Sequence, residues 1–163
     1  MTTAGLAETT LRVASLDDAG ILAALMSEMD DEAQDPVTPA DTAAMRESLV
    51  GMAVYPNFRA YILQDDEGNA IATFSLMIFS GPAHLNAKQA MLDAVVVTRA
   101  WRGKGVGKSL IRHALDIAAQ AGSYKMGLSS NLKRVDAHRF YEDNGFCQHG
   151  ISFGIALGSS AAG

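Results

Sequence analysis

The sequence predicts a mixed α/β domain. Strand-like apolar runs alternate with amphipathic helical segments, and one run, residues 90–98, is apolar at almost every position, which indicates a strand covered on both faces. Of the 163 residues, 48% are hydrophobic and 19% charged, so the chain can fill one core and is not a disordered chain. We see no repeat and no linker. We therefore expect one domain over 1–163, with a tail of small residues over 158–163.

The N-terminal third predicts a strand followed by two helices. Apolar and polar residues alternate over 10–14, as in a half-buried strand. Ser15 and Asp18 have the spacing of a capping box, and apolar residues follow them at helical spacing. Thr38 is a suitable N-cap for a second helix, because Pro39 fits the first helical turn.

A β-hairpin and a strand–turn–helix unit are expected in the middle of the chain. The apolar runs 59–64 and 70–79 flank an acidic turn that contains Gly and Asn, which is typical of a hairpin. The strand 90–98 leads through a glycine-rich turn into a helix over 106–121, and Gly122 would end that helix.

The C-terminal region predicts further strands of the same sheet. A strand is expected over 124–129 and a helix over 133–143. The segments 146–149 and 152–157 would complete the sheet.

Charge is distributed unevenly along the chain. The net charge of −5 argues against general nucleic-acid binding. Residues 1–67 carry 13 acidic and three basic side chains, whereas 88–140 carry ten basic and three acidic ones. The basic region is suited to an anion. The acidic region, which includes Asp30, Asp31, Glu32 and Asp35, suits either a cationic amine or a merely solvated loop.

Cysteine and hydropathy indicate the cellular setting. A single cysteine, Cys147, excludes an internal disulfide and a cysteine-based metal cluster, and it fits a reducing cytoplasm. No window is apolar enough for a membrane span, and the N-terminus has neither a basic nor an apolar leader. We therefore expect a cytoplasmic protein with no membrane partner.

A glycine-rich segment between the strand 90–98 and the helix after it is suited to a pyrophosphate. Its glycines allow backbone N–H groups to approach a ligand, and the helix presents its positive N-terminal end. A Walker A loop would need Gly where Arg102 stands, and the spacing of a Rossmann fingerprint is also missing. The segment reads Arg102-Gly103-Lys104-Gly105-Val106-Gly107-Lys108-Ser109.

The pattern Arg-x-x-Gly-x-Gly resembles the pyrophosphate loop of the GCN5-related N-acetyltransferase (GNAT) family. The segment 137–146, in which a Tyr precedes a Gly-Phe pair, is similar to the second motif of that family. The resemblance covers about residues 10–157, and 131–141 is especially similar to aminoalkylphosphonate N-acetyltransferases. It implies one mixed, mostly antiparallel sheet with helices on both faces. It also implies acetyl-CoA as co-substrate and direct acetyl transfer to a primary amine of a small molecule, which could be an aminoalkylphosphonate.

The resemblance assigns two catalytic residues. Tyr141 would protonate or hydrogen-bond the departing CoA thiolate, with a core aromatic as the structural alternative. Asp93 is expected to be buried in its apolar strand and would accept the amine proton, with a structural salt bridge as its alternative. Other candidate bases are His84, His138 and His149.

The acetyl-CoA contacts follow from the same resemblance. Many members place Asn where Arg134 stands, so Asn131 is the candidate for that contact. The expected contacts are Val95, Val96, Val97, Arg102, Gly103, Lys104, Gly105, Val106, Gly107, Lys108, Ser109, Asn131, Arg134 and Ala137. No metal site is expected. A non-catalytic acyl-CoA sensor and a peptide N-acetyltransferase remain alternatives, and both a monomer and a homodimer remain open.

Overall fold

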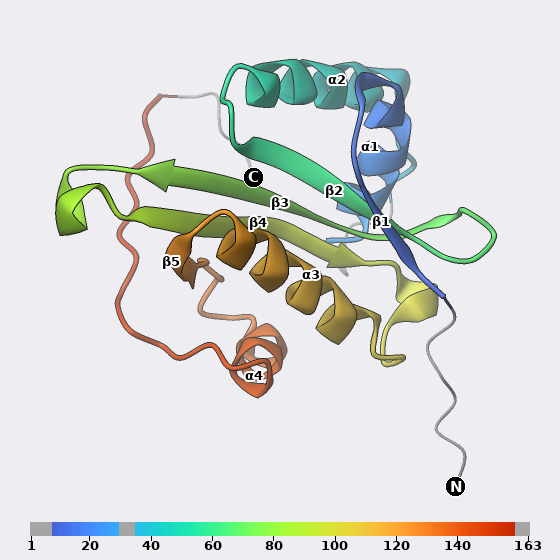
Figure 1. The fold of residues 1–163 in the computed structure, drawn as a ribbon. Coiled ribbons are helices and arrows are strands. Elements are labelled where there is room, and N and C mark those ends of the chain that lie inside the picture. The colour runs from blue at the N-terminus through green and yellow to red at the C-terminus, as the bar shows by residue number, and fades with distance from the viewer. Residues whose placement is uncertain (1–7, 30–34, 159–163) are drawn as a thin grey trace, which may run out of the picture. The chain divides into compact units, whose positions relative to one another are not determined.

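A five-stranded sheet forms the centre of the N-terminal part of the chain (Figure 1). The computed structural model describes residues 8–29 and 35–158, which fall into two compact units, 1–128 and 129–163. The strand order is β1-β2-β3-β4-β5, and only the β4–β5 pair is parallel. The predicted mixed, mostly antiparallel sheet is confirmed.

The helices and strands overlap the segments predicted for them. The strands are β1 (Thr10–Val13), β2 (Phe58–Gln64), β3 (Ala70–Ser80), β4 (Lys88–Val97) and β5 (Ser123–Gly127). The helices are α1 (Ala19–Ser27), α2 (Pro39–Ala53) and α3 (Val106–Gln120) in the first unit and α4 (Val135–Asp143) in the second. Within the described ranges, no helix is long and apolar enough to cross a membrane.

The strands predicted over 146–149 and 152–157 are wrong. Both segments are irregular, and Ile151 and Phe153 are 80% and 94% exposed. Alternating apolar residues form a strand only where a partner strand pairs with them and covers one face. In the second unit, no strand is assigned to any described residue.

Helices cover both faces of the sheet in the first unit. Figure 1 shows α1 and α2 on one face and α3 on the other. Ala60 and Ile62 of β2 belong to the core beneath α1 and α2, together with Leu22, Leu25 and Leu49. On the other face, α3 buries Leu110, Ile111 and Ala114 and packs against β3, β4 and β5.

Capping boxes begin the two N-terminal helical segments: the one predicted at Ser15 is confirmed, and Thr38, predicted as an N-cap, also forms one. Ser15 and Asp18 form one around a short 3₁₀ turn before α1, and Thr38 and Asp41 form the other at α2. Asp18 is nearly buried and accepts two guanidinium hydrogen bonds from Arg12, of 2.7 and 2.8 Å. The Arg12 guanidinium holds the pKa of the Asp18 carboxyl well below its usual range, so this pair ties β1 to the start of α1.

Candidate active site

The strand β4 contains a β-bulge. Thr73 of β3 pairs with Val96, but Ser75 pairs with Asp93, so β4 has one residue more than β3 between these pairs. Ala94 lies in the bulge with a φ of 52°, in the left-handed region that a residue with a Cβ rarely adopts. Strain of this kind, of order 1–3 kcal/mol, concentrates at functional sites.

Beyond the first half of β4, the strands β4 and β5 no longer pair. Their parallel pairing runs from Lys88 to Met91 on β4, and β5 ends at Gly127. In the described part of the first unit, the segment 92–97 therefore has no strand partner on its β5 side. The predicted contacts Val95, Val96 and Val97 lie on this edge, where backbone groups can pair with an extended ligand as a strand would.

Asp93 lies beside the bulge, but its predicted burial is wrong. It is exposed, as is Met91, whereas Leu92 between them is buried, so β4 alternates here. The register places Asp93 opposite Ser75, and Ser75 opposite Ala60, on the sheet face that α1 and α2 cover. No described residue forms a hydrogen bond or ion pair with its carboxylate. Its proposed partner in a structural salt bridge is thus not found, and the carboxylate is accessible to a substrate.

The glycine-rich loop leaves backbone N–H groups without helical acceptors at the start of α3. Gly103 and Gly105 have φ values of 72° and 83°, which explains the need for glycine there. Gly105 is the N-cap and offers no side-chain acceptor, and Ser109 makes a helical hydrogen bond to its carbonyl at 3.1 Å. The backbone N–H groups of 106–108 precede that bond, so they have no acceptor within the helix and suit an anionic group.

Two cationic side chains shape this loop. The Lys104 ammonium lies 5.2 Å from the centre of the Trp101 ring, in a cation–π contact. The Arg102 guanidinium donates to the carbonyls of Val97, at 3.0 Å, and Glu28, at 2.8 Å. Arg102 thus holds the loop to the end of β4 and to the end of α1. Its contact with a pyrophosphate stays a prediction.

In the second unit, Asn131 shapes the turn that leads into α4. Its Oδ1 accepts the backbone N–H of Lys133 at 2.9 Å. The Nε2 of His138 is 2.9 Å from the carbonyl oxygen of Asn131, and because that oxygen only accepts, Nε2 carries a proton. Arg134 is the N-cap residue of α4. The structure therefore brings Asn131, Arg134 and His138 together at the start of α4.

Tyr141 lies in an aromatic cluster near the end of α4. Its ring is edge-to-face with Phe140 and Phe146, with centroids 5.3 and 5.7 Å apart. Tyr141 is partly buried. Ala137 lies four residues earlier and so shares its helix face. These contacts hold the plane of the Tyr141 ring. They are compatible both with a packing role and with a catalytic role of its phenol.

Of the other candidate bases, His84 lies at the opposite end of β4 from the bulge, and His149 lies in an irregular segment. His84 is in the turn before β4, its ring 5.2 Å from that of Tyr124. Ala94 is six residues after Lys88, so at about 3.3 Å per residue the bulge lies about 20 Å along β4 from the end that adjoins the turn of His84. His149 is exposed in an irregular segment.

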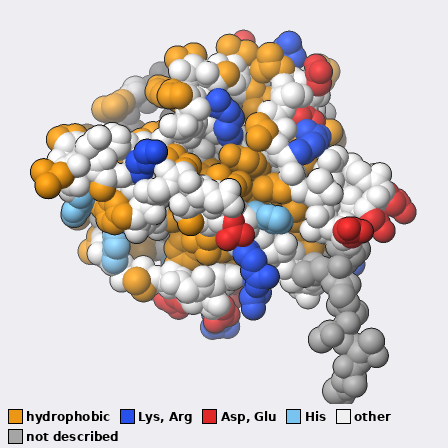
Figure 2. Space-filling model, in the orientation of Figure 1, with side chains coloured by type: hydrophobic (Ala, Val, Ile, Leu, Met, Phe, Trp, Pro, Cys, Tyr) orange, Lys and Arg blue, Asp and Glu red, His pale blue; other side chains and the backbone are white. Residues whose placement is uncertain are grey.

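The acidic candidates of the N-terminal third are only partly described. Asp30, Asp31 and Glu32 lie outside the described residues. Asp35 lines a cavity of about 430 Å³ between α1 and α2. Figure 2 shows basic and acidic side chains dispersed over the visible face, with hydrophobic side chains between them.

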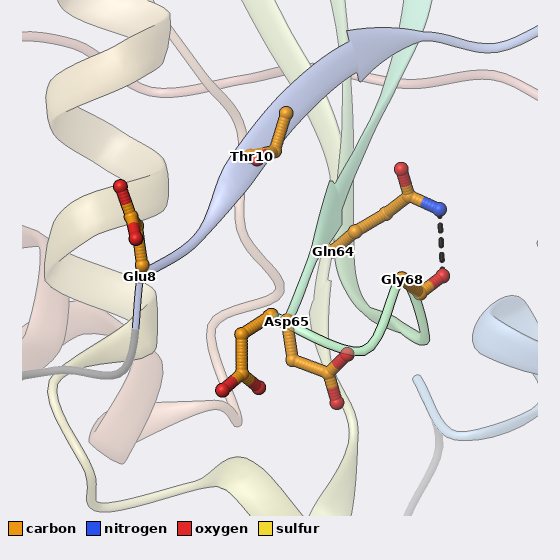
Figure 3. Close-up of a pocket in the computed structure, with 6 residues that line it drawn as sticks. Glu8, Thr10, Gln64, Asp65 and Gly68 are labelled. Atoms are coloured by element: carbon orange, nitrogen blue, oxygen red, sulfur yellow. Dashed lines mark hydrogen bonds between the residues drawn. The ribbon is translucent and has the colours of Figure 1, made fainter.

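A second cavity, of about 310 Å³, lies at the tip of the β2–β3 hairpin (Figure 3). Asp65 lines it, but its carboxylate accepts the backbone N–H groups of Glu67 and Asn69 at 3.0 and 2.8 Å. The Gln64 amide donates to the Gly68 carbonyl at 2.7 Å. These polar groups therefore build the turn.

Comparison with known proteins identifies the family. The model of the family described as "Acetyltransferase (GNAT) family" matches residues 22–146, most of the chain. The chain belongs to the GNAT family. The aminoalkylphosphonate N-acetyltransferase of Salmonella typhimurium is 33% identical to this GNAT chain over 117 residues, covering 72% of this chain and 75% of the relative. The putative phosphinothricin acetyltransferase YwnH of Bacillus subtilis is 31% identical over 102 residues, covering 59% and 58%.

A solved structure supports the same assignment. A putative acetyltransferase from Agrobacterium tumefaciens has a TM-score of 0.76 at 27% identity, over 91% of this GNAT chain and 99% of its own. The named relatives are acetyltransferases, so the protein is an acyltransferase of the N-acetyltransferase class. The predicted family and enzyme class are confirmed.

Proposed function

We propose that the chain transfers acetyl from acetyl-CoA directly to the primary amine of a small molecule, with aminoalkylphosphonates as the first class to test. The observation that carries the proposal is the arrangement along one strand. β4 has a bulge and an unpaired edge, and a short loop leads from its end to Gly105, the N-cap of a helix whose first N–H groups are suited to an anion.

The residues of the first unit fit acetyl-CoA, which supplies the acetyl group as a thioester. The uncapped N–H groups of 106–108 would hold its pyrophosphate, with the exposed Lys108 adding charge. The edge 92–97 would pair with its extended pantetheine. Backbone N–H groups of Val95 to Val97 would polarise the thioester carbonyl, since donors fixed in advance stabilise a developing oxyanion.

Two side chains would move protons. Asp93, exposed on the face beneath α1 and α2, would accept the proton of the substrate ammonium, directly or through water, and the neutral amine then attacks the carbonyl carbon. As the carbon–sulfur bond breaks, the phenol of Tyr141 would donate its proton to the thiolate, and the proton that the attacking nitrogen loses on becoming an amide would return to the phenolate through water. Direct transfer needs no enzyme nucleophile, and Cys147 has no role in it.

The phosphonate part of the proposal rests on the relative from Salmonella typhimurium and on the segment 131–141. A phosphonate needs cationic partners. Arg59, Lys133 and Arg134 are the candidates, and Arg59 is the weakest because its Nη1 donates to the carbonyls of Tyr55 and Phe58 at 3.0 and 2.8 Å.

A thiol-release assay tests the proposal. Acetyl-CoA is incubated with the protein and with aminomethylphosphonate, aminoethylphosphonate, simple primary amines, polyamines or peptides with a free N-terminus. We expect the fastest release with an aminophosphonate. Release only with peptides would contradict the small-molecule assignment, and CoA binding without release for any amine would indicate a sensor.

A further inference from the structure

Glu28, the C-cap residue of α1, makes two hydrogen bonds to the segment that follows β4. The Glu28 carboxylate accepts the backbone N–H of Arg99 through Oε2 at 2.7 Å. Its backbone carbonyl accepts the Arg102 guanidinium at 2.8 Å. Glu28 and Arg99 are 71 residues apart in sequence, so these bonds are tertiary ties between α1 and the loop that follows β4.

Glu28 supplies an acceptor that the turn itself does not provide for the N–H of Arg99. Arg99 begins a 3₁₀ turn, Arg99–Trp101, whose N-cap Thr98 makes no side-chain cap. The turn closes with the Trp101 N–H donating to the Thr98 carbonyl at 2.9 Å, so the N–H of Arg99 has no acceptor within the turn. A carboxylate is a strong acceptor for such a group, because charge-assisted hydrogen bonds are shorter and stronger than neutral ones.

We propose that Glu28 is a positioning residue for acetyl-CoA: by capping the turn Arg99–Trp101 it sets the direction of the short loop that ends at Gly105. This rests on the proposed function, since it assumes that the loop receives CoA. Only residues 102–104 separate the capped turn from Gly105, the N-cap of α3. A tilt of the turn is therefore carried to the N–H groups of 106–108.

The segment is fixed at both ends, and in its middle the Glu28 carboxylate acts on the turn while the Arg102 guanidinium acts on the loop that follows. The Thr98 N–H donates to the Ile71 carbonyl of β3 at 3.0 Å. Val106, at the start of α3, is 1% exposed. Without the Glu28 bond, the turn between these two anchors would lose its cap while β4 and α3 stayed in place.

Two variants of Glu28 distinguish the effect of its hydrogen bond to Arg99 from the effect of its negative charge. Glu28→Met keeps a long side chain but has no oxygen acceptor, whereas Glu28→Gln keeps a carbonyl oxygen that can accept the Arg99 N–H. Glu47→Met is the matched control, because Glu47 is an exposed residue of α2. We expect Glu28→Met to raise the Kd for CoA about tenfold, Glu28→Gln to stay within about threefold, and Glu47→Met to leave it unchanged. At saturating acetyl-CoA, kcat of Glu28→Met should stay near wild type, since the bond acts on binding.

A second pair of variants removes the donor instead of the acceptor. Arg99→Pro has no N–H, and Thr98 already has φ −57° and ψ 146°, a conformation that is allowed before proline. Arg99→Ala controls for loss of the side chain. If the bond positions CoA, Arg99→Pro weakens CoA binding more than Arg99→Ala does, and adds little in a Glu28→Met background. If Glu28→Met does not fold, the comparison of Arg99→Pro with Arg99→Ala still tests whether this hydrogen bond positions CoA.

Amide hydrogen exchange without ligand distinguishes this inference from the proposed function. We expect faster exchange over 98–105 in Glu28→Met than in Glu47→Met. Unchanged exchange, unchanged CoA affinity in a folded Glu28→Met, or equal losses in Glu28→Gln and Glu28→Met would each overturn the inference. If the wild-type protein binds no CoA, the proposed function fails, and the role of Glu28 in positioning CoA fails with it. The exchange measurement then reports only whether the cap exists.

Discussion

Substitution of Gly105 should weaken CoA binding and stability together. Gly105 is the N-cap of α3 and has a φ of 83°. An alanine forced into the left-handed region is destabilised by about 1–2 kcal/mol. Gly122, at the other end of α3, has a φ of 81°, and an added Cβ there would meet nothing within 4 Å. Gly122→Ala therefore introduces the same backbone strain away from the loop and is the matched control.

The two variants should differ in affinity but not in stability. For a chain of 163 residues, a loss of 1–2 kcal/mol lowers Tm by about 2–8 °C in both. In Gly105→Ala the strained N-cap also displaces the N–H groups of 106–108, and returning them to their positions on binding costs about a further 1–2 kcal/mol, which raises the Kd for CoA by about 5- to 30-fold. Thermal melting and titration calorimetry in one buffer measure both quantities. The reasoning is refuted if Gly105→Ala melts earlier yet binds CoA like wild type, or if Gly122→Ala weakens binding as much.

Three further predictions concern single side chains. Tyr141→Phe should lower kcat about 100-fold with CoA affinity unchanged, as steady-state kinetics and calorimetry would show, and wild-type rates from about pH 6 to about pH 9 would instead make Tyr141 a packing residue. Asp93→Asn should remain stable while its rate recovers as pH approaches the pKa of the amine, so a stability loss without this pH dependence would contradict its role as base. Because the pKa of Asp18 is lowered by its ion pair, the pair stabilises the fold above the usual carboxyl pKa of about 4 and loses that contribution as pH falls. At neutral pH, Asp18→Asn should lower the free energy of unfolding, measured in urea, by about 1–2 kcal/mol. This value is reduced because the Arg12 side chain is 34% exposed to solvent. The loss should be smaller in acid, and an equal loss at both pH values would contradict the pH dependence.

Local signals explain what could be predicted of the fold. Three signals act within a few residues and can therefore be recognised in the sequence. They are the capping box at Ser15, the Thr38–Pro39 start of α2 and the glycine that ends α3. The C-terminal strands failed for the opposite reason. The alternation from Ile151 onward matches a strand, but pairing and cover depend on distant residues, which sequence periodicity does not report.

The same distinction applies to the candidate site. A phosphate-binding turn is expected to need glycine, and Gly103 and Gly105 do have the positive φ values that favour glycine, while their contact with a phosphate stays a prediction. The bulge carried no such signal, because alanine at position 94 is an ordinary strand residue in sequence. The contact of Glu28 joins residues 71 apart and was likewise hidden. Asp93 was expected to be buried because the apolar run masked the alternation of β4.

The loop that follows β4, residues 98–105, is held by bonds to its neighbours as well as by its own 3₁₀ turn. β3 fixes one end through the Thr98–Ile71 bond, α1 fixes the turn through Glu28, and the Arg102 guanidinium folds back to the Val97 carbonyl. Each of these ties joins two groups of the protein itself and needs no ligand atom, and a loop ordered in this way costs less to position on binding. Loss of one of these hydrogen bonds should therefore change the direction of the backbone N–H groups of 106–108 without unfolding the sheet. That is why affinity for CoA, measured against melting temperature, is the sensitive readout for this region.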